Sequence, residues 1–314
     1  MDNFAFVKGT EVRNLLFYGL LPHLDSALSN EQYGHLAMYI CGVRLLHSGN
    51  LFGDATSTIA RRLFSQFHQD HELYYNRLQS FKLHMHCHYA SMFESHGSLC
   101  NLGCFGQESF IGSISDNHHG TRYYGDSIAY YYNLDFFIQD KKKEAATEDG
   151  PYDRSSTLAS TCEFIDRFHT DRCDCGQLNS CCTTYDRYSI DGNMFHSERY
   201  SKRKSSVSYF VQFTLDDDQD HIRFGSIQWF FICQGIGHAV IQCHRTASLY
   251  SDCFKNSPYY HILREPVDRL YFLLEKVPFR DHIVRTDSIT NHCVIVEKND
   301  HLFTSSILSY DEHD

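Results

Sequence analysis

The sequence lacks any hydrophobic run long enough to cross a membrane. Its longest apolar runs, at 14–21 and 225–233, fall well short of the roughly 18 consecutive apolar residues that a transmembrane helix needs. The first residues, 1–9, also lack the basic start, apolar stretch and small-residue cleavage site of a signal peptide. These absences predict a soluble intracellular protein, nuclear or cytoplasmic, with no membrane partner.

Positive charge is also scarce. The chain has 28 lysines and arginines against 39 aspartates and glutamates, a formal net charge of −11 at pH 7. Proteins that bind nucleic acid usually have a basic surface. The composition therefore excludes a generally cationic surface and leaves room only for local basic patches.

The cysteine content argues against a disulfide scaffold. Thirteen cysteines are scattered through a chain that has no visible secretion signal, so free thiols are the expected state. Many should be buried, where cysteine behaves as a small hydrophobic residue. With 42% hydrophobic and 21% charged residues, the chain is too apolar for wholesale disorder.

The first part of the chain, residues 1–139, has the apolar spacing of helices. Asn30 is the expected N-terminal cap of the predicted helix at 30–47. The predicted helices cover 30–47, 54–80, 83–93, 105–115 and 122–138. The last of these has Tyr, Leu and Phe on most faces, which is typical of a helix packed on several sides.

The rest of the chain divides into two parts. Residues 140–206 form a Cys/Ser-rich linker without a sustained apolar period, which predicts mostly irregular structure. From Val207 the apolar period becomes two, which predicts a small antiparallel β-rich module over 207–310. Its predicted strands cover 207–214, 222–233, 239–243, 270–274, 293–296 and 302–307. The predicted fold class is therefore α+β.

A dense group of histidines lies at 84–88. His84 and His88 would lie one helical turn apart, the spacing at which two imidazoles bind one metal, and Glu108 is a possible third ligand. Zinc metallopeptidases place a general-base Glu directly after the first His, but Met85 stands there. A zinc-binding hydrolase is thus a second alternative, and helix-packing histidines are the competing interpretation.

The wider segment 81–112 resembles the C-terminal part of CACTA (En/Spm-like) DNA transposases of the metazoan, transposon-derived branch. The matching positions are His84, His88, Gly97, Leu99, Asn101, Phe105, Glu108, Phe110 and Gly112. The tripeptide His119-Gly120-Thr121 and the apolar run 14–22, which ends in Leu-Pro, match as well. The resemblance covers about residues 10–138.

The resemblance implies that the helical region is a remnant of an RNase H-like transposase domain. In such nucleases two Asp and a late Glu hold two Mg²⁺ or Mn²⁺ ions that carry out phosphoryl transfer on DNA. Glu108 would be that late Glu, and His84 and His88 would orient the neighbouring helix or contact the metal.

The sequence departs from the family where catalysis is decided. The strands that should carry the two Asp would precede Met1, and Asp25 and Asp54 flank helices instead. We therefore expect a domesticated, transposon-derived protein that needs no cofactor, lacks catalysis alone and binds DNA or a transposase-like partner chain. The alternative is a fragment or subunit of an active metal-dependent DDE-type transposase.

A second possible metal site lies in the linker. Cys173, Cys175, Cys181 and Cys182, flanked by Cys162, His169 and His196, have the residue types that bind zinc. Their spacing departs from the paired Cys-x2-Cys of zinc ribbons, so unpaired thiols remain the competing interpretation. The basic run 201–205 is either a nuclear-import or phosphate-contact patch or a solvated group of charges.

Overall fold

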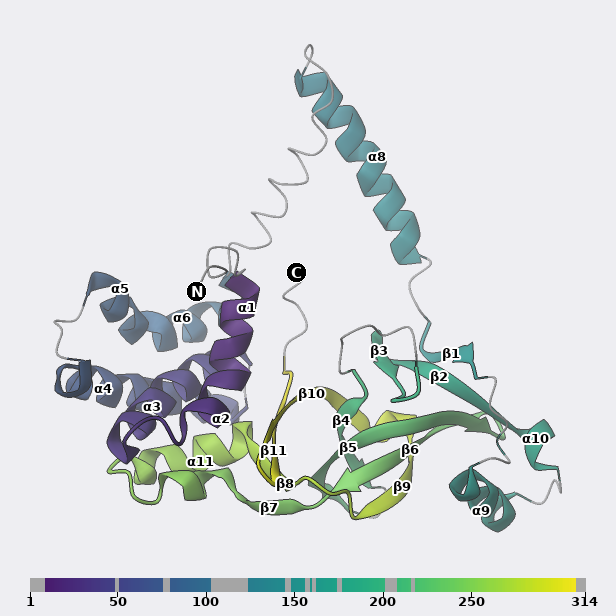
Figure 1. Ribbon diagram of the computed structural model, residues 1–314. Coiled ribbons are helices and arrows are strands. Elements are labelled where there is room, and N and C mark those ends of the chain that lie inside the picture. Colours follow the sequence, from purple (N-terminus) through teal and green to yellow (C-terminus); the bar gives the residue numbers. More distant parts are fainter. Residues whose placement is uncertain are drawn as a thin grey trace, which may run out of the picture.

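The computed structural model describes residues 9–48, 51–75, 80–102, 124–144, 148–155, 159, 162–173, 177–200, 208–215 and 218–308. Helices dominate the first part of the chain and antiparallel strands the second (Figure 1). The predicted α+β class is confirmed, with the helical region before the sheet. None of the described helices is both long and apolar enough to cross a membrane.

The N-terminal helices pack around α3. They are α1 (Gly9–Asn14), a π-helical turn (Leu15–Gly19), α2 (Leu20–Leu24), α3 (Asn30–His47), α4 (Thr56–Tyr75), α5 (Phe81–His84) and α6 (Tyr89–His96), with short 3-10 turns at Gly53–Ala55, Met85–His88 and Leu99–Leu102. α3 packs against α4, and α6 covers both. The predicted helix at 83–93 is thus interrupted by a 3-10 turn, and the one at 105–115 lies outside the described residues.

α3 covers the predicted range 30–47, but its cap lies one residue earlier than expected. The side chain of Ser29, not Asn30, accepts the N–H of Gln32, and the Gln32 side chain accepts the N–H of Ser29 in return. This reciprocal pair satisfies two backbone donors that the first turn leaves unpaired. The predicted cap is therefore wrong by one position, because Ser29 has the extended backbone that a cap requires.

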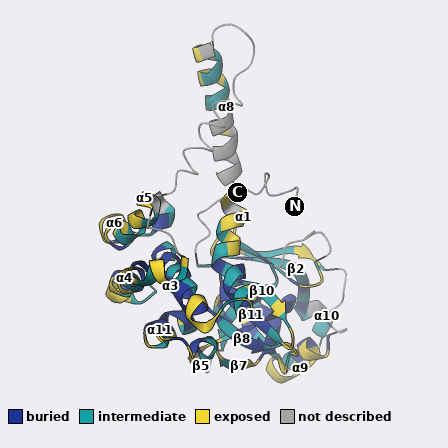
Figure 2. Cartoon of the chain, turned by 60° about the vertical axis from the view of Figure 1, so that its left-hand side comes forward, coloured by how far each residue is buried: buried dark blue, intermediate teal, exposed yellow. Residues whose placement is uncertain are grey.

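α8 (Tyr124–Glu144) does not pack on several sides as predicted. The side chains of Tyr130 and Phe137 are 65% and 60% exposed, and the described residues of α8 belong to none of the four apolar clusters. Figure 2 shows buried residues where the other helices and strands meet, whereas the described part of α8 is exposed or intermediate. The apolar spacing of 122–138 therefore predicts the helix correctly, but the prediction that this helix packs on several sides is wrong.

The strands are β1 (Gly150–Arg154), β2 (Cys182–Ile190), β3 (Asn193–His196), β4 (Phe210–Leu215), β5 (Asp218–Cys233), β6 (Ile236–His244), β7 (Thr246–Leu249), β8 (Phe272–Glu275), β9 (Arg280–Arg285), β10 (Ile289–Lys298) and β11 (His301–Ser306). Their order is β1-β2-β5-β4-β10-β11-β8-β7, with β3 beside β2, and β6 between β5 and β9. Each of the six predicted strands overlaps one of these.

The prediction that 140–206 is mostly irregular is wrong for its described residues. This stretch contains β1, β2, β3, α9 (Glu163–Arg172) and α10 (Leu178–Cys181). β2 pairs with β5, and α9 packs on the sheet by burying Ile165 beside Trp229 and Phe231. Contacts with β5, rather than a regular apolar spacing of their own, stabilise these short elements. Their sequences therefore give little sign of helix or strand. The boundaries of the three parts stay a prediction.

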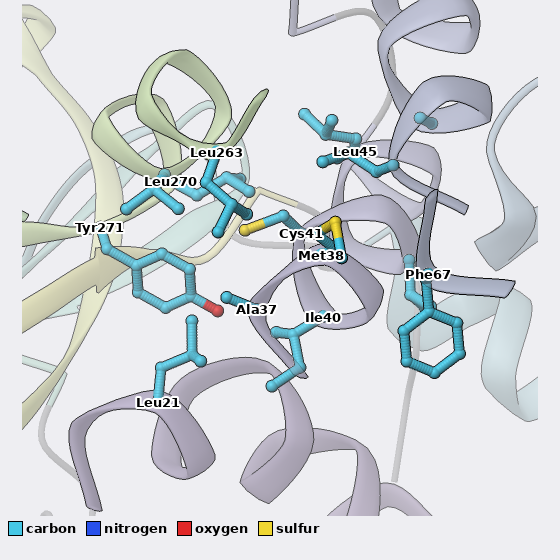
Figure 3. Close-up of a cluster of buried hydrophobic side chains, with 14 of the residues drawn as sticks. Leu21, Ala37, Met38, Ile40, Cys41, Leu45, Phe67, Leu263, Leu270 and Tyr271 are labelled. Carbon is cyan, nitrogen blue, oxygen red and sulfur yellow. The ribbon is translucent and has the colours of Figure 1, made fainter. Parts of the chain in front are cut away.

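The helices and the sheet share one apolar core. Figure 3 shows Leu263 of α11 (Tyr260–Leu270) and the adjacent Tyr271 beside Cys41 and Ala37 of α3. The hydroxyls of Tyr33 and Tyr250 lie 3.0 Å apart, so distant parts of the sequence meet in this core. Short 3-10 turns at Tyr250–Phe254 and Thr286–Ser288 complete the C-terminal half.

Candidate metal centre

Four elements end at one place beside the sheet. α9 ends at Arg172, just before Cys173, and α10 ends at Cys181, just before β2 starts at Cys182. β5 ends at Cys233, which lies directly across from Cys182 in the β2–β5 pair. α9 and α10 lie together at this end of the sheet (Figure 1). Cysteines from separate elements are thereby brought together.

These residues form two overlapping groups of potential metal ligands. His169, Cys173 and Cys181 make one group and Cys181, Cys182 and Cys233 the other, with the ligand atoms of each group within 4.8 Å of one another. The Sγ atom of Cys181 lies 3.4 Å from that of Cys173 and 3.7 Å from that of Cys233. A tetrahedral zinc with Zn–S bonds of about 2.3 Å separates its sulfurs by about 3.8 Å. Each of these two distances is therefore close to that between a pair of thiolates on one zinc ion.

The local structure fixes the ligands before any metal arrives. His169 and Cys173 lie one turn apart at the end of α9, where the Cys173 N–H donates to the His169 carbonyl at 2.8 Å. The side-chain amide of Gln234 donates to the Cys173 Sγ at 3.3 Å. Hydrogen bonds of this kind orient the ligands of a metal site and tune them. Gln234 is held by the β5–β6 turn, where it has φ 52°.

Burial makes this a closed site. His169, Cys173, Cys182 and Cys233 are between 3% and 8% exposed. Burial raises the pKa of Cys182 to about 11 and that of Cys233 to about 12. Zinc would displace these thiol protons, because only the thiolate binds the metal.

The structure brings together part of the predicted zinc set. His169, Cys173, Cys181 and Cys182 meet, whereas Cys175 lies outside the described residues. Two other predicted candidates lie outside these groups. Cys162 is buried in the same apolar cluster as Cys173, Cys182 and Cys233 but belongs to neither ligand group. His196 hydrogen-bonds to Ser208 and stacks on Tyr200.

Sequence reasoning missed Cys233. It lies far along the chain from Cys182, and only the register of β2 against β5 places the two side by side. The local spacing of cysteines carries no signal for this pairing. The available clue was that the predicted strand 222–233 ends in a cysteine. This clue is not specific, because cysteine is often buried in proteins without binding a metal.

The structure describes only two of the three residues of the other predicted metal site, His84 and His88. The rings of His84 and His88 lie 5.4 Å apart, and both side chains are exposed, so their interpretation as packed helix residues is wrong. His86 is the residue that packs, with ring contacts to Tyr39 and Tyr89. Glu108 lies outside the described residues, as does the basic run 201–205. A metal at His84, His88 and Glu108 stays a prediction.

No family model, curated protein or solved structure matches the chain.

Proposed function

We propose that the protein is a transposon-derived binding protein that does not cut DNA by itself and whose sheet is secured by a structural zinc ion. The transposon origin is supported by the spaced positions between 81 and 112. The zinc is supported by one observation, the two overlapping ligand triads, His169/Cys173/Cys181 and Cys181/Cys182/Cys233, which share Cys181. Cys233 and Cys182 are the two candidates for the fourth ligand.

The chemistry of the cluster favours a structural role over a catalytic one. Structural zinc sites use four sulfur or imidazole ligands, whereas catalytic sites keep one position open for water or substrate. Here the ligands are sulfur-rich, and four of them are almost fully buried. The cluster therefore supports a binding protein better than a zinc-dependent hydrolase.

The metal content of the purified protein tests the zinc. After dialysis under reducing conditions, we expect one zinc ion per chain, measured by inductively coupled plasma mass spectrometry. His169→Asn and Cys181→Ser should each lose the metal, because each removes a proposed ligand, and Cys181 is the one shared by both triads. Only one of Cys233→Ser and Cys182→Ser should lose it, which identifies the fourth ligand.

Cys162→Ser is the matched control for this experiment. It removes a buried thiol that shares the apolar cluster of the proposed ligands but belongs to neither ligand group, so it should keep the zinc. Wild-type protein without zinc, or Cys181→Ser protein with its full complement, would show that the cluster is a group of unligated thiols.

The expectation that the chain does not cut DNA has its own test. Purified protein incubated with supercoiled plasmid and Mg²⁺ or Mn²⁺ should leave the plasmid intact, because a single late Glu cannot hold two metal ions. Nicking that Glu108→Gln abolishes would instead favour an active DDE-type transposase. Nicking that Glu108→Gln leaves unchanged would indicate a contaminating nuclease.

A further inference from the structure

Three arginines from three elements line one pocket of about 530 Å³. They are Arg172 at the end of α9, Arg223 near the start of β5 and Arg280 at the start of β9. His282 of β9 lines the same space. We call this space the arginine pocket. Its volume falls within the roughly 300–1,000 Å³ typical of small-molecule sites.

The positive charge of the arginine pocket is only partly balanced. Asp218 lies 2.8 Å from the guanidinium of Arg223 and also contacts His221. Arg172 and Arg280 make no ion pair within the described ranges. The Nε atom of Arg223 is buried and has no hydrogen-bond partner there.

The neighbouring acidic residue on β9 does not neutralise the arginine pocket. Asp281 stands between Arg280 and His282 on β9. Asp281 is absent from the residues that line the pocket, whereas Arg280 and His282 both line it. A chain with a net charge of −11 thus gathers three guanidinium groups around one space.

We propose that the arginine pocket binds a phosphate group, either of a free nucleotide or of a nucleic-acid backbone. Guanidinium groups pair with phosphate oxygens through two parallel hydrogen bonds, and three of them from different directions enclose a tetrahedral anion. The unpartnered Arg223 Nε supplies one such donor. Phe279 also lines the pocket and is partly exposed, with the Arg245 guanidinium 5.0 Å from the centre of its ring.

This pocket goes beyond the proposed function, because its residues are not the ligands of the metal cluster. Phosphate binding can fail while zinc is retained, and zinc can be absent while phosphate binds. The two outcomes are therefore measured separately, with the zinc content of every variant determined alongside its binding.

Two phosphate probes distinguish the two sources. ATP binding is measured by calorimetry, and binding of a short labelled single-stranded oligonucleotide by fluorescence anisotropy at low and physiological salt. The test variant is Arg172→Met/Arg280→Met, which leaves the Arg223–Asp218 pair intact. The control is Arg264→Met/Arg269→Met, which removes the same charge from two exposed arginines of α11 outside the pocket.

We expect the full-length protein to bind at least one probe, and the test variant to bind it at least about tenfold more weakly, the effect of losing charge-assisted hydrogen bonds. The control variant should bind like the wild type. Binding of ATP alone would identify a nucleotide site, and binding of the oligonucleotide with a strong salt dependence would identify a backbone site. Absence of binding to both probes, or equal losses in test and control variants, would overturn the proposal.

Discussion

Arg44 places a positive charge in the middle of the shared core, where it is fully buried. Its guanidinium lies 4.9 Å from the ring of Tyr18 and 4.7 Å from that of Tyr271, and it donates to the carbonyl oxygens of Leu270 and Ser306 at 3.4 and 3.3 Å. Among the described residues no carboxylate pairs with it. Aromatic faces and backbone oxygens supply the negative potential instead, and the end of α3 adds to it.

Three histidines that are buried or partly buried make the stability of the protein depend on pH. Burial lowers the pKa of His47, His68 and His292 to about 4, and the nearby Arg13, His86 and His196, respectively, add to the effect. In the unfolded chain histidine titrates near 6.5, so between about pH 6.5 and 4 the unfolded chain binds more protons. The free energy of unfolding should therefore be highest above pH 6.5 and fall as the pH drops, by at most about 1.4 kcal/mol per pH unit for each histidine.

Urea denaturation at pH 7 and pH 5 measures this effect. His292→Gln serves as the comparison, because it removes one titrating group and should reduce the difference between the two pH values. Equal free energies of unfolding at pH 7 and pH 5 would show that these histidines do not control the acid stability.

Among the elements, β5 tolerates no side chain at Gly225. This residue pairs with Val211 on one side and Cys243 on the other, and a Cβ atom there would lie 2.4 Å from the carbonyl oxygen of Gln242. That oxygen is backbone, so Gly225→Ala must displace β6. We expect it to lower the free energy of unfolding by about 2–3 kcal/mol, the scale of an overpacked core.

Gly125→Ala is the matched control, since a Cβ at Gly125 in α8 would meet no neighbour. Alanine is the better helix former, so this variant should unfold at the same denaturant concentration as the wild type or slightly above it. Equal stability of the Gly225→Ala and Gly125→Ala proteins would show that β6 can move aside at no cost.

The elements that the sequence predicts best are those whose stability comes from their own pattern. The stretch 207–214, which contains most of β4, alternates apolar and polar residues, and apolar residues recur at helical spacing along α3. α11 was not predicted, although its apolar residues recur at helical spacing, because Pro266 lies inside it and proline ordinarily ends a helix. Strands β1 to β3 could not be predicted, because their stability depends on pairing with one another and with β5.

The same distinction applies to the metal cluster. His169 and Cys173 are four residues apart and Cys181 and Cys182 are adjacent, so the sequence alone groups them. Cys233 joins only through strand register, which depends on the whole sheet. Local spacing therefore predicts four of the five cluster residues, and only Cys233 is added by the topology of the sheet.

For the whole molecule, the shared core predicts that the helical region cannot fold alone. Leu263, Leu270, Tyr271 and Phe303 complete the apolar cluster formed by the N-terminal helices. A fragment of residues 1–139 should therefore expose this apolar surface, bind a hydrophobic dye and unfold without a cooperative transition. The full-length chain in the same buffer is the control, and a sharp melt of the monomeric fragment would contradict the prediction.

The hydrogen bond between Tyr33 and Tyr250 also sets an order of events during synthesis. The two tyrosines are 217 positions apart, and at roughly 5–20 residues per second a ribosome needs about 10–40 s to travel between them. During that interval the N-terminal helices are already made, but the segments that bury them are not. The newly made chain should therefore depend on chaperones more than its size suggests, because its earliest helices must wait for its last strands.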